Sequence, residues 1–115
     1  MKLLLTLSLL STLLLANQVE IIKVTSSNQG NTYTFHVTLL HEDSSWEHYA
    51  DSWSVLDKDK KLISKRVLWH PHEHEQPFTR SQSGIKIAKN TKFVYIRAHD
   101  KVHGYTKKLY KYKLK

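Results

Sequence analysis

Along most of this chain, apolar and polar residues alternate at every second position, and polar turn residues interrupt the alternation about every ten residues. Successive side chains of a β-strand point to opposite faces, so this pattern predicts half-buried antiparallel strands rather than helices. No stretch after residue 17 has the three-to-four-residue spacing of a helical stripe. The ranges that fit a strand are 18–25, 31–41, 48–57, 61–70, 84–88, 92–99 and 105–114.

The number of these strands predicts the fold class. About seven short strands within residues 17–115 are typical of an all-β domain, a single antiparallel β-sandwich of immunoglobulin-like or fibronectin-III-like architecture. Trp53 is in phase with Val55, and we interpret it as the core tryptophan of the sandwich. Trp46 and Trp69 flank the histidine-rich segments, where they either wall a pocket or cap the core.

The first residues predict export. Residues 1–16, MKLLLTLSLLSTLLLA, contain one lysine and an apolar stretch that ends at a small residue. This is typical of a secretory signal peptide cleaved after Ala16, since the stretch is too short for a membrane-spanning helix. The remaining domain, 17–115, is then expected in the periplasm or outside the cell. The sequence contains no cysteine, which excludes disulfides, thiolate metal ligands and a lipidated cysteine.

Histidines are concentrated in three of the six expected connections. SSNQGN, DKDKK and AKNTK are plain polar turns, whereas HEDSSWEH, HPHEHEQPFTRSQSG and HDKVHG contain histidine. Consecutive antiparallel strands reverse direction, so alternate connections emerge at opposite ends of a sandwich. The histidine-bearing connections are the second, fourth and sixth. Seven of the eight histidines are therefore predicted at one end, and only His36 lies in the middle of a strand.

The segment HPHEHE, residues 70–75, is the most typical of a metal site. Side chains at positions i and i+2 of an extended segment point to the same face about 7 Å apart, so His70 and His72 can approach one ion. Pro71 favours an extended conformation at His70. Taken alone, such a segment is more often an exposed polar loop than a metal site. Two further histidine-bearing loops at the same end favour the metal site, because histidine brings no benefit to a turn.

We therefore predict one ion bound by imidazoles from these loops. Neutral imidazole suits Zn(II) and Cu(II), and the lack of sulfur ligands after Met1 disfavours Cu(I). Nearby carboxylates commonly orient such imidazoles, and the candidates for that role are Glu42, Asp43, Asp51 and Asp100. The predicted metal ligands are His70, His72, His41 and His48, followed by His99 and His103.

The charge distribution supports a second hypothesis. The formal net charge is +8, and six lysines but no acidic residue follow Asp100. These lysines fit an exposed last strand that is protected from aggregation. They also fit a basic face that contacts an envelope polyanion or a protein partner. The alternative is thus an immunoglobulin-like binding module without metal, whose histidines respond to acid.

Enzyme motifs are not apparent in the sequence. It contains no Gly-x-Ser-x-Gly, no His-Glu-x-x-His and no glycine-rich phosphate loop. Binding is therefore expected rather than catalysis, and the third alternative, a metal-dependent hydrolase or oxidase, would need an open coordination position and a substrate pocket. Motifs for specific nucleic-acid recognition are missing as well, and no segment is long enough to span a membrane.

Three segments, HEDSSWEHYADSW, HPHEHEQPFTRS and IRAHDKVHGY, together resemble a group of small exported proteins of Gram-negative bacteria. The resemblance covers about residues 33–105 and implies an exported β-domain without implying an activity. A weaker similarity is to immunoglobulin-like periplasmic copper proteins and copper polysaccharide monooxygenases, which use an N-terminal histidine as a ligand. Asn17 would take that position here, which argues against their copper chemistry.

Overall fold

The computed structural model describes residues 18–114, and the predicted signal peptide lies outside them. The described residues form eight strands and no helix, which confirms the all-β prediction. No helix that could cross a bilayer therefore occurs between residues 18 and 114. The strands are β1 (Glu20–Asn28), β2 (Tyr33–Leu40), β3 (Ala50–Leu56), β4 (Leu62–Val67), β5 (Phe78–Ile85), β6 (Phe93–Asp100), β7 (Gly104–Tyr105) and β8 (Tyr110–Lys113).

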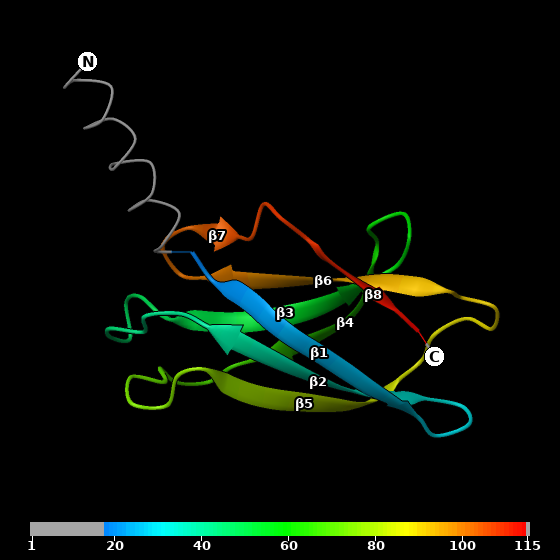
Figure 1. The fold of residues 1–115 in the computed structure, drawn as a ribbon. Helices are drawn as coiled ribbons and strands as arrows, with labels where there is room; N and C mark the ends of the chain where they lie inside the picture. Colours follow the sequence, from blue (N-terminus) through cyan, green and yellow to red (C-terminus); the bar gives the residue numbers. More distant parts are fainter. Residues whose placement is uncertain (1–17, 115) are drawn as a thin grey trace, which may run out of the picture.

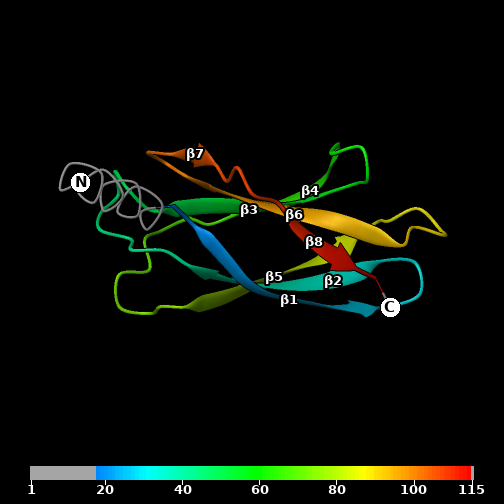
Figure 2. The ribbon, with the colours of Figure 1, turned by 45° about the horizontal axis from the view of Figure 1, so that its top comes forward.

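The strands form two antiparallel sheets (Figure 1). One sheet has the order β1-β2-β5. The other has the order β4-β3-β6-β7, and β8 pairs with β6 farther along the same edge. Figure 2 shows the sheets as two layers, with β1, β2 and β5 in one and β3, β4 and β6 in the other. The prediction of packed antiparallel sheets is thus confirmed.

Alternate residues of the central strands fill the space between the sheets. Phe35 and Val37 of β2 and Val55 of β3 are fully buried, and Trp53 is 1% exposed. The structure therefore places Trp53 in the core, as its phase in the sequence predicts. Burial of each such side chain contributes about 1.5–3 kcal/mol, so these strands anchor the loops at their ends.

The last predicted strand is in fact two, which raises the count from seven to eight. The amide of Thr106 donates to the carbonyl of Ala98 at 2.9 Å, and the Ala98 amide donates to the Thr106 hydroxyl at 3.2 Å. A side-chain oxygen thus takes the place of a backbone carbonyl in the ladder. The chain leaves β6 after Thr106 and pairs with it again from Tyr110.

The strand predicted at 84–88 instead spans Phe78–Ile85. In its middle, Arg80 lies opposite the buried Val37, and Gln82 lies opposite Phe35. These polar residues occupy positions where an apolar residue would have marked the strand. A search for alternating hydrophobic residues therefore finds only its end.

Three connections gather at one end of the sandwich (Figure 1). The register places the ends of the strands together there, since Leu39 pairs with Phe78 and Ala50 pairs with Asp100. We call residues 41–49, 68–77 and 99–103 the histidine pole. It holds seven of the eight histidines, as predicted, because His36 lies within β2. The first two connections cross between the sheets and so close this end of the core.

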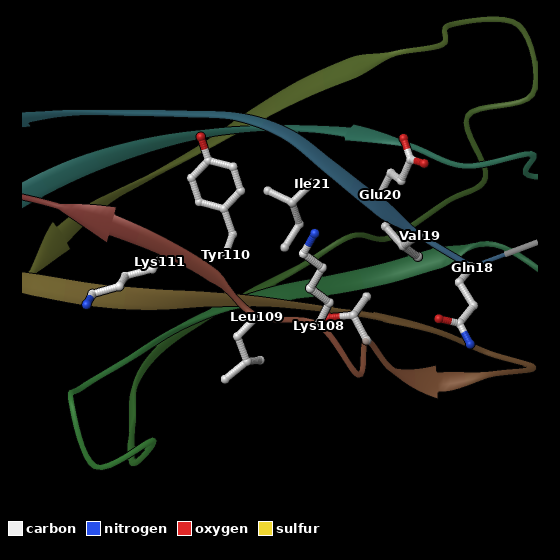
Figure 3. A pocket seen from close by; sticks show the side chains of 9 residues that line it. Gln18, Val19, Glu20, Ile21, Lys108, Leu109, Tyr110 and Lys111 are labelled. Carbon is white, nitrogen blue, oxygen red and sulfur yellow. The ribbon is translucent and has the colours of Figure 1, made fainter. Parts of the chain in front are cut away.

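A groove of about 610 Å³ follows the seam between the sheets (Figure 3). It lies between the first residues of β1 and the segment 106–111, and its lining includes Val19, Ile21, Leu109 and Tyr110. None of the described histidines lines this groove. It is therefore separate from the histidine cluster.

Candidate metal centre

Two strands direct a polar side chain into the histidine pole at the point where each strand ends. In β2 the inward face of Leu39 continues to His41, and in β6 the inward face of Ala98 continues to Asp100. The side chains of His41 and Asp100 are each 1% exposed. His41 Nε2 lies 3.6 Å from Asp100 Oδ2. Strand alternation alone thus brings an imidazole and a carboxylate face to face at the end of the core.

A tight turn at 45–48 brings a second imidazole to the same carboxylate. The His48 amide donates to the Ser45 carbonyl at 3.2 Å, and the Ser44 amide donates to the His48 carbonyl at 3.1 Å. His48 Nε2 lies 3.7 Å from Asp100 Oδ1, and its ring centroid is 4.9 Å from that of His41. One ligand atom from each of His41, His48 and Asp100 falls within 4.8 Å of the others.

Asp43 fixes the orientation of His41. Its Oδ1 accepts hydrogen bonds from His41 Nδ1 at 2.6 Å and from the Ala50 amide at 3.0 Å. Its Oδ2 accepts one from the His72 amide at 2.7 Å. Burial raises the pKa of Asp43, but these hydrogen bonds outweigh it and hold the pKa below its usual value. Because Nδ1 of His41 donates to the carboxylate, Nε2 of the neutral ring presents a lone pair.

Asp100 is held in place by the turn that follows it. Its Oδ1 accepts the amides of Val102 at 2.8 Å and His103 at 2.6 Å. Gly104, with φ of 77°, allows the tight return into β7. His103 Nδ1 lies 3.3 Å from Asp100 Oδ2, so a third imidazole borders the group. The side chains of His48 and His103 are 25% exposed and form its solvent side.

The cluster leaves two buried nitrogens without hydrogen bonds. They are Nε2 of His41 and Nε2 of His48, and both face Asp100. A buried polar atom without a partner costs about 1–3 kcal/mol, and a lone pair that faces a carboxylate is repelled by it. A cation or an additional proton between these atoms would remove both costs. Two ligands about 2.05 Å from a tetrahedral Zn(II) ion lie roughly 3.3 Å apart. His41 Nε2 and His48 Nε2 lie 3.6 Å and 3.7 Å from the two different oxygens of Asp100, and the three ligand atoms lie within 4.8 Å of one another, so a bound ion would draw them closer together.

The other predicted ligands lie elsewhere in the pole. His99 is on the outward face of β6, where its Nδ1 lies 2.5 Å from Asp51 Oδ1. His70 and His72 lie on the far side of Asp43, and His72 Nδ1 is 3.8 Å from Asp43 Oδ2. The structure therefore brings His41, His48 and His103 together around one carboxylate, but it does not bring His70, His72 or His99 into that group.

Asp100 is the residue whose position the sequence interpretation did not anticipate. We expected it to orient a histidine, as Asp43 and Asp51 do, whereas it lies among the candidate ligands. The signal was present in the sequence. Counting every second residue back from Asp100 reaches Ala98 and the apolar residues of β6, which puts Asp100 on the inward face and His99 on the outward one.

Comparison with known proteins gives one informative relative. A protein of Halomicrobium mukohataei described as "Putative lipoprotein" is 37% identical over 89 residues, which cover 76% of this chain and 43% of that protein. The chain thus spans less than half the length of this relative. No family model matches the chain. No solved structure matches it either.

Proposed function

We propose that this protein binds one Zn(II) or Cu(II) ion through His41 Nε2, His48 Nε2 and the Asp100 carboxylate. The observation that carries the proposal is the convergence of two buried, unpartnered imidazole nitrogens on a buried carboxylate. Two nitrogen donors and one oxygen donor, with no sulfur, suit either ion. Three protein ligands leave a further coordination position, which His103 or water would occupy.

The charges around the cluster support a divalent cation. Asp43 and Asp100 place two buried carboxylates on opposite sides of the His41 ring. A buried carboxylate is costly unless it is paired with positive charge. An ion at His41 Nε2 would compensate Asp100 directly. Asp43 would then strengthen the His41 ligand through Nδ1, which is the usual arrangement of a carboxylate behind a metal-bound histidine.

The arrangement of the ligands also supports exchange of the ion with solvent. His41, Asp43 and Asp100 form a buried floor, while His48 and His103 lie at the surface. An ion would therefore enter past two partly exposed imidazoles without unfolding the sandwich. We favour a role in metal handling or structural stabilisation, and catalysis would need a substrate site beside the open position.

We further propose that the binding takes place in the periplasm or outside the cell. The apolar leader at 1–16 supports export, and the name of the Halomicrobium protein is compatible with it. The present sequence has no cysteine, so a lipid anchor is not part of the proposal.

We also assign the sandwich to the immunoglobulin-like or fibronectin-III-like kind. Support comes from the strand order, in which β1-β2-β5 faces β4-β3-β6-β7. The hairpin β1–β2 lies in one sheet and the next hairpin, β3–β4, lies in the other, so the connection between them crosses from sheet to sheet. In such sandwiches, loops at one end commonly form binding sites, and the histidine pole has that position.

Calorimetric titration of the chain without a histidine tag tests the metal site. Zn(II) should bind with a Kd below about 1 μM, which corresponds to about −8 kcal/mol. His41→Gln and Asp100→Asn should each weaken this binding at least tenfold, because each removes one donor from the group.

The matched control is His36→Gln, a histidine within β2 that lies outside the pole and contacts Ser81 at 2.6 Å. It should leave the affinity unchanged. The proposal fails if neither Zn(II) nor Cu(II) binds the wild-type chain more tightly than about 10 μM, or about −7 kcal/mol. It also fails if His36→Gln weakens binding as much as His41→Gln does.

A further inference from the structure

The loop His70–Glu75 borders a second hollow in the histidine pole, separate from the His41, His48 and Asp100 cluster. This hollow has a volume of about 490 Å³, and Trp46 also lines it. Asp43 stands between the two regions, since its Oδ1 is bonded to His41 Nδ1 while its Oδ2 faces His72. The cluster described above therefore does not account for the imidazoles of this loop.

His72 is the most informative residue of the hollow. Its side chain is only 4% exposed, and its ring stacks on Phe78 with centroids 3.9 Å apart and planes 9° from parallel. Neither ring nitrogen has a hydrogen-bond partner. The large majority of buried side-chain polar atoms in proteins have at least one hydrogen-bond partner. A ligand in the hollow would supply the missing interaction.

His70 is placed to share that ligand. Its Nδ1 lies 3.2 Å from the Pro71 carbonyl, which favours the proton on Nδ1 and leaves a lone pair on Nε2. The ring centroids of His70 and His72 are 4.6 Å apart. Two imidazoles bound at right angles to one ion at about 2.0 Å have centroids roughly 4.5 Å apart, while a tetrahedral angle gives about 5.2 Å.

The backbone around His72 is braced on both sides. The His72 amide donates to Asp43 Oδ2 at 2.7 Å, and its carbonyl accepts from Gln76 Nε2 at 2.9 Å. Gln76 Oε1 in turn accepts the His41 amide at 3.0 Å. These bonds tie the loop to the end of β2, so His72 is held before any ligand arrives. Such preorganisation reduces the entropy lost on binding.

We propose that His70 and His72 form a second, independent metal site, selective for Cu(II). The spacing of the two rings fits the right-angled ligands of tetragonal Cu(II) coordination. An oxygen ligand would come from a carboxylate that lines the same hollow. Glu73 is the carboxylate available for this role, because Glu75 is engaged by Arg80 Nη2 at 2.9 Å. The site goes beyond the function proposed above and does not depend on it.

Stoichiometry with Cu(II) alone tests the second site. The tag-free chain, titrated with Cu(II) and analysed by metal content and electron paramagnetic resonance, should bind two ions with distinct spectra. His70→Gln should remove one ion and its spectrum, and His41→Gln should remove the other. His36→Gln, a histidine of β2 outside the histidine pole, should leave both.

The two variants are chosen so that a loss of Cu(II) binding cannot come from loss of the fold. His70 is exposed, so His70→Gln removes a donor without disturbing the core. His72→Phe keeps an aromatic ring against Phe78 and should also lose one ion. Near-ultraviolet circular dichroism verifies that both variants keep the packing of Trp53.

Each result separates the two proposals. A single Cu(II) in the wild type that His70→Gln retains overturns the second site and leaves the His41 site standing. A single ion that disappears in His70→Gln but persists in His41→Gln overturns the His41 site instead. Two ions that both survive in His70→Gln and His72→Phe also overturn the second site.

Discussion

Asp43 is the residue that connects the two sides of the histidine pole. It accepts one hydrogen bond from the His41 ring and one each from the backbone amides of Ala50 and His72. Replacing it would leave three buried donors without their acceptor, each at a cost of about 1–3 kcal/mol. Asp43 therefore stabilises the loops and orients His41 at the same time.

The buried imidazole of His72 makes stability depend on pH. Burial lowers the pKa of His72, and the nearby positive charges of Arg80 and His70 lower it further. Below about pH 6.5 the unfolded chain takes up this proton before the folded chain does. The contribution of His72 is thus complete above about pH 6.5 and is lost as the pH falls through the lowered value. Denaturant unfolding in the presence of a chelator should show stability falling with acid, by at most about 1.4 kcal/mol per pH unit for this proton.

His72→Phe provides the control for this prediction. The phenyl ring keeps the stacking on Phe78 but cannot bind a proton. Its unfolding free energy should vary less between pH 6.5 and pH 5.5 than that of the wild type. An identical pH dependence in the two proteins would show that His72 makes no contribution.

Among single residues, those that follow strand alternation could be predicted from the sequence. Trp53 was correctly placed in the core by its phase with Val55. The same reasoning, extended past the strand ends, would have placed His41 and Asp100 inside and His99 outside. The position of His48 could not be predicted, because it depends on the turn at 45–48.

Among the elements, β8 has the features of a protected edge strand. Its tyrosines Tyr110 and Tyr112 are partly buried against the core, while Lys111 and Lys113 are exposed. It pairs only with β6 among the described strands. Charged residues on such an edge hinder pairing with another chain, so the lysines have a structural explanation that requires no partner.

The lysines allow a test against the binding-module hypothesis. Combined Lys107→Glu, Lys111→Glu and Lys113→Glu should leave the Kd for Zn(II) within about threefold of wild type, because solvent screens charges on remote exposed residues. Calorimetry under matched ionic strength measures this. If the triple variant loses association with the cell envelope while chelation of metal has no effect on it, the basic-face hypothesis is preferred.

Strand existence could be predicted from the sequence better than strand boundaries. The apolar alternation marked β2, β3 and β6 closely, because both their inward faces and their turns are regular. It missed the start of β5, whose inward positions include Arg80 and Gln82, and it merged β7 with β8. In β5, polar side chains occupy inward positions, and after β7 a threonine hydroxyl replaces a backbone acceptor. A search for alternating hydrophobic residues detects neither feature.

For the whole molecule, the gathering of histidines at one pole follows from the order of the strands. Alternate connections of an antiparallel chain share an end, so the pole could be predicted by counting strands along the sequence. Which of the loop histidines join His41 and Asp100 within that pole was not predictable. It depends on where the connections 41–49 and 68–77 cross from one sheet to the other, and those crossings separate His72 from His41 by placing Asp43 between them.

X-ray absorption at the zinc edge, on tag-free chain loaded with one equivalent of Zn(II), tests the central claim most directly. The spectrum should show about four nitrogen or oxygen neighbours at about 2.0–2.1 Å, with the outer scattering of at least two imidazole rings. His41→Gln should reduce that imidazole scattering, while His36→Gln should not. A shell of oxygen neighbours without imidazole, the same in wild type and His41→Gln, would contradict a metal centre at His41, His48 and Asp100.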